Sequence, residues 1–249
     1  MSGHSKWHNI RLRKGKVDAQ RGALFTKLSK EIILAAKSGS PDPEANYRLK
    51  MAVDKARENN VPQDNIKRAI ARGSAGSGEK DIEELRYEGY GPHGIAVVLD
   101  AATDNRNRTA GEMRFLFSKN GGVLGEAGSV GWMFESVGIV VADAGGRTED
   151  ELLEMALVDG VIDMDFDERA EIFTEPTALS SAREALSEKG LHVSEFYLGM
   201  RPKVRVALQG GELSEALHFL DALDAHEDAQ HLFSNLEITQ AALESFANA

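Results

Sequence analysis

The chain has 249 residues, 42% of them hydrophobic and 28% charged, which is ordinary for a folded protein and excludes collagen-like and wholly disordered chains. This length predicts two or three modest domains, each with its own core. Because the sequence has no cysteine, disulfide frameworks, thiolate zinc sites, iron–sulfur clusters and cysteine nucleophiles are excluded.

The formal charge of −11 is unevenly distributed along the chain. Residues 1–80 carry 17 Lys and Arg against 8 Asp and Glu, whereas residues 81–249 carry 12 against 32. A basic N-terminal part is typical of proteins that bind a polyanion, and the acidic body behind it would repel the same polyanion.

No membrane or export segment is predicted. The longest apolar runs, 95–99 and 139–142, are far shorter than the roughly 20 residues that a membrane span needs. The basic N-terminus is not followed by the apolar segment of a signal peptide. We therefore expect a soluble, cytoplasmic protein with no membrane partner.

Three helices are predicted in the first 73 residues. Helical spacing of apolar residues predicts a long amphipathic helix over residues 18–36, which Gly39 ends. Asp42 and Pro43 predict the N-cap and first turn of a second helix. Its expected buried stripe consists of Leu49, Val53 and Ala56.

The third helix is predicted to begin at Pro62 and to close at Gly73. The Gly- and Ser-rich segment 74–78 then predicts a flexible linker and the first domain boundary.

Beyond the linker the pattern changes to mixed strands and helices. Strands are predicted at 95–99, 139–142, 161–167, 170–175, 191–198 and 203–208, with a last strand near Leu232. Helices are predicted at 109–120, at 177–189 and around Leu217. A further helix is predicted to begin at Thr148, with Glu151 completing a capping box. The order within 137–198 is that of a ferredoxin-like domain.

We therefore predict an α+β protein with three domains. Residues 1–78 form a basic three-helix module that binds nucleic acid. Residues 82–132 and 203–240 form a discontinuous α/β domain, because the late elements complete the part that begins near residue 82. Residues 133–202 form a second α/β domain inserted into the first, and both α/β domains are expected to be ferredoxin-like.

An acidic run at 163–167 imitates the first ligands of a calcium loop. Glu168 stands where such a loop needs glycine, so we predict no metal site there. An alternating strand explains the run better, with its aspartates facing water. The residues expected on the core face of that strand are Ile162, Met164 and Phe166.

Nothing in the sequence supports an enzyme. The seven histidines show no metalloprotease spacing, and no nucleophile elbow is present. His226, Glu227 and Asp228 near His231 would form at most a chance surface metal site. We predict no enzyme activity, no catalytic residue, no cofactor and no metal.

Residues 2–16 form a basic arm without an apolar stripe, which cannot make a core of its own but could wrap a phosphate backbone. Trp7 has two alternatives, stacking on an exposed base or docking into the helical module. The predicted nucleic-acid-binding residues of the arm and the first helix are His4, Ser5, Lys6, Trp7, Asn9, Arg11, Arg13, Lys14, Lys16, Arg21 and Lys27.

A second basic cluster lies between a strand and a helix. Arg106 and Arg108 stand at a helix N-terminus, where cations oppose the helix dipole and need a compensating partner. Asp104 could supply that partner with Asn107 as the helix cap, or the two arginines could hold a nucleic-acid phosphate. Both arginines are therefore included among the predicted nucleic-acid-binding residues.

Several strings, in order over residues 3–135, carry a specific resemblance: Gly3-His4-Ser5-Lys6-Trp7, Phe25-Thr26-Lys27-Leu28, Tyr87-Glu88-Gly89-Tyr90-Gly91-Pro92, Thr103 to Thr109 and Gly128-Ser129-Val130. The sequence resembles the YebC/PmpR family of bacterial regulatory proteins, whose mitochondrial relatives activate translation of a cytochrome oxidase subunit. The resemblance implies a basic helical domain and two α/β domains, with no enzyme activity and no cofactor.

The resemblance also implies a regulator of gene expression, for which we predict DNA-binding transcriptional regulation. The alternative is a ribosome-associated translation factor that contacts rRNA and tRNA and relieves stalls such as those at proline runs. A third hypothesis, from charge alone, is an acidic interaction protein that docks basic proteins. Deleting residues 1–16 should abolish nucleic-acid binding under the first two hypotheses and leave it little changed under the third.

Overall fold

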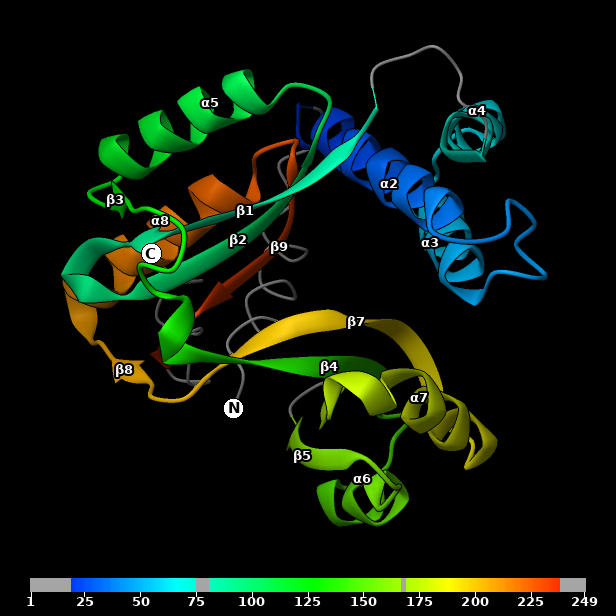
Figure 1. The fold of residues 1–249 in the computed structure, drawn as a ribbon. Coiled ribbons are helices and arrows are strands. Elements are labelled where there is room, and N and C mark those ends of the chain that lie inside the picture. The colour runs from blue at the N-terminus through cyan, green and yellow to red at the C-terminus, as the bar shows by residue number, and fades with distance from the viewer. Residues whose placement is uncertain (1–18, 75–80, 167–168, 238–249) are drawn as a thin grey trace.

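The computed structural model describes residues 19–74, 81–166 and 169–237 (Figure 1). It is a mixed α+β protein, as predicted, with three N-terminal helices followed by two four-stranded sheets and their helices. No described helix is long and apolar enough to cross a membrane.

The N-terminal helices pack around one shared core. They are α2 (Ala19–Lys37), α3 (Tyr47–Glu58) and α4 (Gln63–Ser74). Leu28 and Ile32 of α2 meet Leu49 and Val53 of α3 and Ile66 of α4 in this core. The helical periodicity therefore predicted both the helices and their buried faces correctly.

The predicted start of the second helix was wrong. Asp42 forms a turn in which its carboxylate accepts a hydrogen bond from the backbone N–H of Glu44, 3.0 Å away. The cap is Asn46, whose side-chain oxygen accepts from the Leu49 N–H at 3.1 Å. Its amide group also donates to the carbonyls of Ala35 and Ser40 at 2.9 and 2.8 Å. Asn46 thus fixes the connection between α2 and α3, and tertiary contacts select it over Asp42.

The first sheet contains, in spatial order, β3 (Val123–Leu124), β1 (Glu83–Tyr90), β2 (Ala96–Thr103) and β9 (Ala229–Ser234), each antiparallel to its neighbour. Helices α5 (Arg106–Lys119) and α8 (Gly210–Asp224) cover one of its faces. A short 3-10 turn, η1 (Pro92–Gly94), joins β1 to β2. The sequence did not predict β1, because its apolar residues Leu85 and Tyr87 are few and only half-buried.

The second sheet contains, in spatial order, β5 (Val161–Phe166), β6 (Arg169–Thr174), β4 (Phe134–Asp143) and β7 (His192–Pro202), again all antiparallel. Helix α6 (Glu149–Ala156) and helix α7 (Leu179–Glu188) cover its outer face. This is the ferredoxin-like order that the sequence predicts, and the predicted capping box of Thr148 and Glu151 is present. The domain boundaries themselves stay a prediction.

The two sheets pack face to face, and β2 is central to that packing. Its Val97 and Leu99 face α5 and α8, whereas Val98 faces the second sheet, where it meets Ile139 of β4 and Phe173 of β6. The layers are therefore helices, first sheet, second sheet and helices, with α2 crossing one end of the first sheet (Figure 1). This burial on both faces explains the uninterrupted apolar run of β2.

Two strand predictions fail in detail. Ile162 is 48% exposed instead of facing the core, because the register of β5 shifts between Val161 and Asp163, while Met164 and Phe166 pack inward as expected. The strand expected at 203–208 shortens to β8 (Val206–Ala207), which pairs in parallel with β10 (Leu236–Glu237).

Candidate nucleic-acid interface

Most of the predicted arm lies outside the described residues. This holds for His4, Ser5, Lys6, Trp7, Asn9, Arg11, Arg13, Lys14 and Lys16. Arg21 lies in the first turn of α2, but its side chain is not among the described ones. Lys27, Arg106 and Arg108 are the predicted site residues whose side chains the structure places.

Lys27 and Arg108 are brought to the same junction, at the N-terminal end of α5. Both carboxylate oxygens of the fully buried Asp228 accept hydrogen bonds from Arg108 Nη2, at 3.2 and 3.0 Å. Lys30 of α2 makes a short ion pair with the same carboxylate. One turn earlier on α2, Lys27 Nζ lies 3.1 Å from the carboxylate of Asp224, the last residue of α8.

The carboxylate of Asp228 is kept ionised by these contacts. Burial by itself would raise the pKa of Asp228, but hydrogen bonds from Lys30, Thr109 and Arg108 and the charge of Lys30 together lower it. The Thr109 hydroxyl donates to the carboxylate at 2.6 Å and also lies 2.8 Å from the Thr103 hydroxyl. Asp228 therefore joins α2, α5 and the end of β2 into one network.

The two predicted arginines differ in their surroundings. Arg108 pairs with Asp104 at 3.5 Å, as the structural alternative expected, and also with Asp228. Arg106 has a side chain that is 68% exposed, with a loose ion pair to Glu83 at 3.7 Å. The helix cap is Asn105, which accepts from the Arg108 N–H, so the prediction of Asn107 was wrong. Of this pair, Arg106 is the residue free to meet a phosphate.

The acidic cluster around His226 does not favour a metal. Ligand atoms of Glu112, His226 and Asp228 lie within 4.8 Å of one another. Lys30 and Arg108 already contact Asp228, and their positive charges oppose a cation at this corner. The absence of a metal site around His226 and Asp228 stays a prediction.

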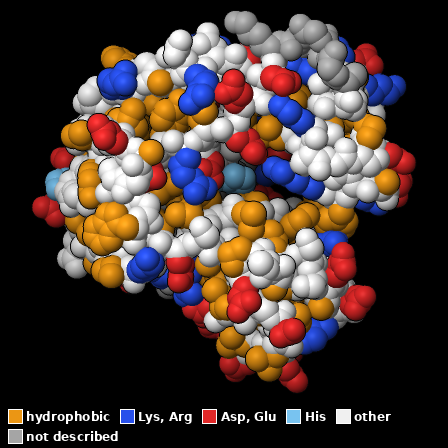
Figure 2. Space-filling model, in the orientation of Figure 1, with side chains coloured by type: hydrophobic (Ala, Val, Ile, Leu, Met, Phe, Trp, Pro, Cys, Tyr) orange, Lys and Arg blue, Asp and Glu red, His pale blue; other side chains and the backbone are white. Residues whose placement is uncertain are grey.

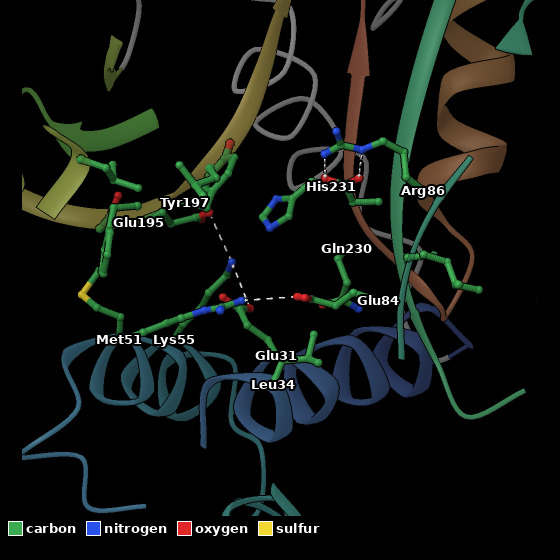
Figure 3. Close-up of a pocket in the computed structure, with 18 residues that line it drawn as sticks. Glu31, Leu34, Met51, Lys55, Glu84, Arg86, Glu195, Tyr197, Gln230 and His231 are labelled. Atoms are coloured by element: carbon green, nitrogen blue, oxygen red, sulfur yellow. Dashed lines mark hydrogen bonds and ion pairs between the residues drawn. The ribbon is translucent and has the colours of Figure 1, made fainter. Parts of the chain in front are cut away.

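Sequence reasoning missed a central cleft of about 580 Å³ between α2, α3, the first sheet and β7 (Figure 3). Lys55 of α3 spans it, with Nζ 3.5 Å from the carboxylate of Glu31 and 3.3 Å from that of Glu195. Burial would lower the pKa of Lys55, but these two carboxylates raise it above its usual value. Lys55 thus stays charged and connects the helical module to the second sheet.

Further pairs line the same cleft. Arg86 Nε lies 2.7 Å from the carboxylate of Asp100, and the ring of His231 stacks on that of Tyr197 with centroids 4.1 Å apart. Arg86 and Asp100 face each other across the neighbouring strands β1 and β2, whereas Tyr197 and His231 join β7 to β9, so neither pair has a local spacing that signals it. The charged side chains in the cleft form ion pairs with one another. Such pairing is expected of a contact between modules and not of a groove that binds phosphate.

The fold and the two junctions define a protein in which a basic three-helix module is fastened by ion pairs to a pair of packed antiparallel sheets. Residues 5–76 match the model of the TACO1/YebC protein N-terminal domain, and residues 82–236 match that of the TACO1/YebC second and third domain. The chain belongs to the TACO1/YebC family, which confirms the resemblance seen in the sequence.

Individual relatives match over nearly the whole chain. A probable transcriptional regulatory protein of Pelotomaculum thermopropionicum is 47% identical over 241 residues, covering 96% of this chain and 99% of the relative. One of Chloroflexus aggregans is 47% identical over 250 residues, covering 99% of each. The crystal structure of the conserved hypothetical protein Aq1575 from Aquifex aeolicus is similar with a TM-score of 0.80 and 41% identity, covering 90% of this chain and 93% of that one.

Proposed function

We propose that the protein is a cytoplasmic nucleic-acid-binding regulator of gene expression, and that it acts as a DNA-binding transcriptional regulator without enzyme activity. The observation that carries the proposal is the convergence of the basic elements. Lys27 and Lys30 fasten α2, the helix that follows the basic arm, beside the N-terminus of α5. Exposed Arg106 lies at that end of α5.

The ion pairs at Asp228 and Asp224 also change the electrostatic surroundings of α2. They neutralise acidic groups of the body beside α2, which reduces the repulsion of a polyanion there. Lys27 lies eight residues after Ala19, about 12 Å along the helix, so the junction is close to the first residues of α2, the helix that follows the arm in the sequence. The relatives named as probable transcriptional regulatory proteins support the regulatory role.

A ribosome-associated translation factor that contacts rRNA and tRNA is the second candidate. The charge of the body favours it, because residues 81–249 carry 12 cations against 32 acids and would repel a long duplex. A short basic arm can enter folded RNA, where backbone contacts and stacking by Trp7 need no base code.

One experiment separates the two candidates. The tagged full-length protein is crosslinked in cells, sedimented through a sucrose gradient with and without RNase, and the attached nucleic acid is sequenced. Slow sedimentation with crosslinks to promoter DNA is the result expected of a transcriptional regulator. RNase-sensitive co-migration with ribosomes and crosslinks to rRNA or tRNA would establish the translation factor instead, and crosslinks to neither would overturn the proposal.

A further inference from the structure

Helix α5 is a basic element in the acidic part of the chain. It holds Arg106, Arg108, Arg114 and Lys119, four of the 12 Lys and Arg in residues 81–249, against the single acid Glu112. Figure 2, in the orientation of Figure 1, shows basic side chains on the surface over this helix. The charge of the helix is thus opposite to that of the body on which it lies.

The outward side of α5 combines these cations with an exposed aromatic ring. Thr109, Met113 and Phe117 are buried against the sheet, whereas Phe115 is 60% exposed. Lys119 Nζ lies 5.6 Å from the centroid of the Phe115 ring. The Arg114 side chain on the other flank is exposed and makes no ion pair or hydrogen bond with the described residues.

The same side contains a glycine that packing does not explain. Gly111 lies in the middle of α5 and is exposed, and a Cβ added there would meet nothing within 4 Å. Its backbone is helical, so the position does not require glycine, which is less favourable than alanine in a helix. Glycine at such a position leaves room for a partner to approach the helix backbone closely.

We propose that this outward face of α5, formed by Gly111, Arg114, Phe115 and Lys119, binds an unpaired stretch of nucleic acid. A base stacks on Phe115, the phosphates on either side meet Arg114 and Lys119, and Gly111 leaves room for the strand against the helix. The inference rests on the proposed function and extends it to the form of the ligand and to a surface other than the arm.

The combination of ring and cations selects this ligand class. An aromatic ring flanked by cations is the general arrangement of stacking platforms for single strands, because every base has a π face. The helix is about 20 Å long, the rise of about six nucleotides of a B-form strand. Arg106, whose side chain is 68% exposed, adds a further cation at the N-terminal end of the same helix.

Binding is measured with the full-length protein and three labelled probes, a single-stranded RNA of about 12 nucleotides, the DNA of the same sequence and the corresponding duplex. Phe115→Ala should weaken binding of a single strand by about 5- to 150-fold, the effect of losing one stacked base. The control Leu157→Ala removes a side chain that is 77% exposed on another surface, and should leave affinity unchanged.

The charges are tested by their salt dependence. Arg114→Glu/Lys119→Glu should reduce the slope of log affinity against log salt by about 1.4, since each phosphate contact on a single strand contributes about 0.7. Arg147→Glu/Lys189→Glu makes the same change of net charge near the second sheet and serves as the control. The RNA and DNA arms of the experiment identify which strand is preferred.

Gly111→Ala separates binding from folding. It should raise the thermal midpoint of the protein, because alanine favours the helix, and lower its affinity for the single strand. If the wild type binds a probe and Arg13→Glu/Lys14→Glu abolishes binding, but all α5 variants bind within twofold of the wild type, this inference is overturned and the proposed function stands. If the wild type binds no nucleic acid, both are overturned.

Discussion

Two buried carboxylates organise the parts of this molecule that matter for its proposed function. Asp228 accepts hydrogen bonds from Lys30, Thr109 and Arg108, and so holds α2 against α5. Glu88 on β1 accepts from three backbone N–H groups of one loop, and so fixes the turn that precedes β4. Each carboxylate accepts hydrogen bonds from three residues, and hydrogen bonds to an ionised group are stronger than those between neutral groups.

Asp228→Asn should lower the free energy of unfolding by about 3–5 kcal/mol, because it leaves the buried Lys30 ammonium without its counter-charge. Urea unfolding measures the change. Asp159→Asn, at an exposed position on a loop, is the matched control and should change stability by less than about 0.5 kcal/mol. An equal effect of the two variants would show that Asp228 does not fasten α2.

The stabilisation that Asp228 provides should depend on pH in a definite direction. Native contacts lower the pKa of Asp228, so its contribution is complete above the unfolded value of about 3.9 and is lost as the pH falls through the lower native pKa. The stability difference between wild type and Asp228→Asn should therefore be constant between about pH 5 and 7 and shrink below about pH 4. A difference that grows on acidification would contradict this assignment.

Glu88→Gln replaces one acceptor oxygen by an amide that faces backbone donors of Gly128, Val130 or Gly131. It should destabilise the protein by about 2 kcal/mol, since hydrogen bonds to a charged group are among the stronger ones. Thermal unfolding of Glu88→Gln and of the loop control Glu126→Gln measures the difference. Equal midpoints would mean that the loop holds its shape without Glu88.

At the scale of helices and strands, the sequence was informative wherever burial follows a regular period. The helical stripe of α2 and the apolar run of β2 were predicted because one face of α2 and both faces of β2 are buried. β1 was missed because Glu88, one of its most buried residues, is a carboxylate that backbone donors of a distant loop satisfy. Asn46 was missed as the cap of α3 because Asp42 is an equally good cap by residue type.

The cap of α3 supplies a test at this scale. Asn46→Ala should cost about 2 kcal/mol, because it removes the cap and also the bonds to the carbonyls of Ala35 and Ser40. Asp42→Ala should cost less than about 0.5 kcal/mol, because Asp42 closes only an exposed turn. Chemical denaturation of both variants checks the pair, and a larger loss for Asp42→Ala would contradict the structural assignment of the cap.

For the molecule as a whole, the uneven distribution of charge along the chain could be seen in the sequence. The ion-pair partners of the individual basic residues could not. Lys27 and Arg108 were predicted as basic site residues, and the fold shows them neutralised by Asp224 and Asp228, which lie 197 and 120 residues away in the chain. Lys55, which spans the central cleft, gave no local signal for the same reason. Ion pairs between distant elements need the topology before they can be recognised.

The salt dependence of affinity shows whether the basic N-terminal arm binds the phosphate backbone of a nucleic acid. Each phosphate that the full-length protein neutralises should contribute about 0.7 to 0.9 to the slope of log affinity against log salt. We expect a steep slope for the wild type and a clearly shallower one for Arg13→Glu/Lys14→Glu. An unchanged slope in that variant would contradict it.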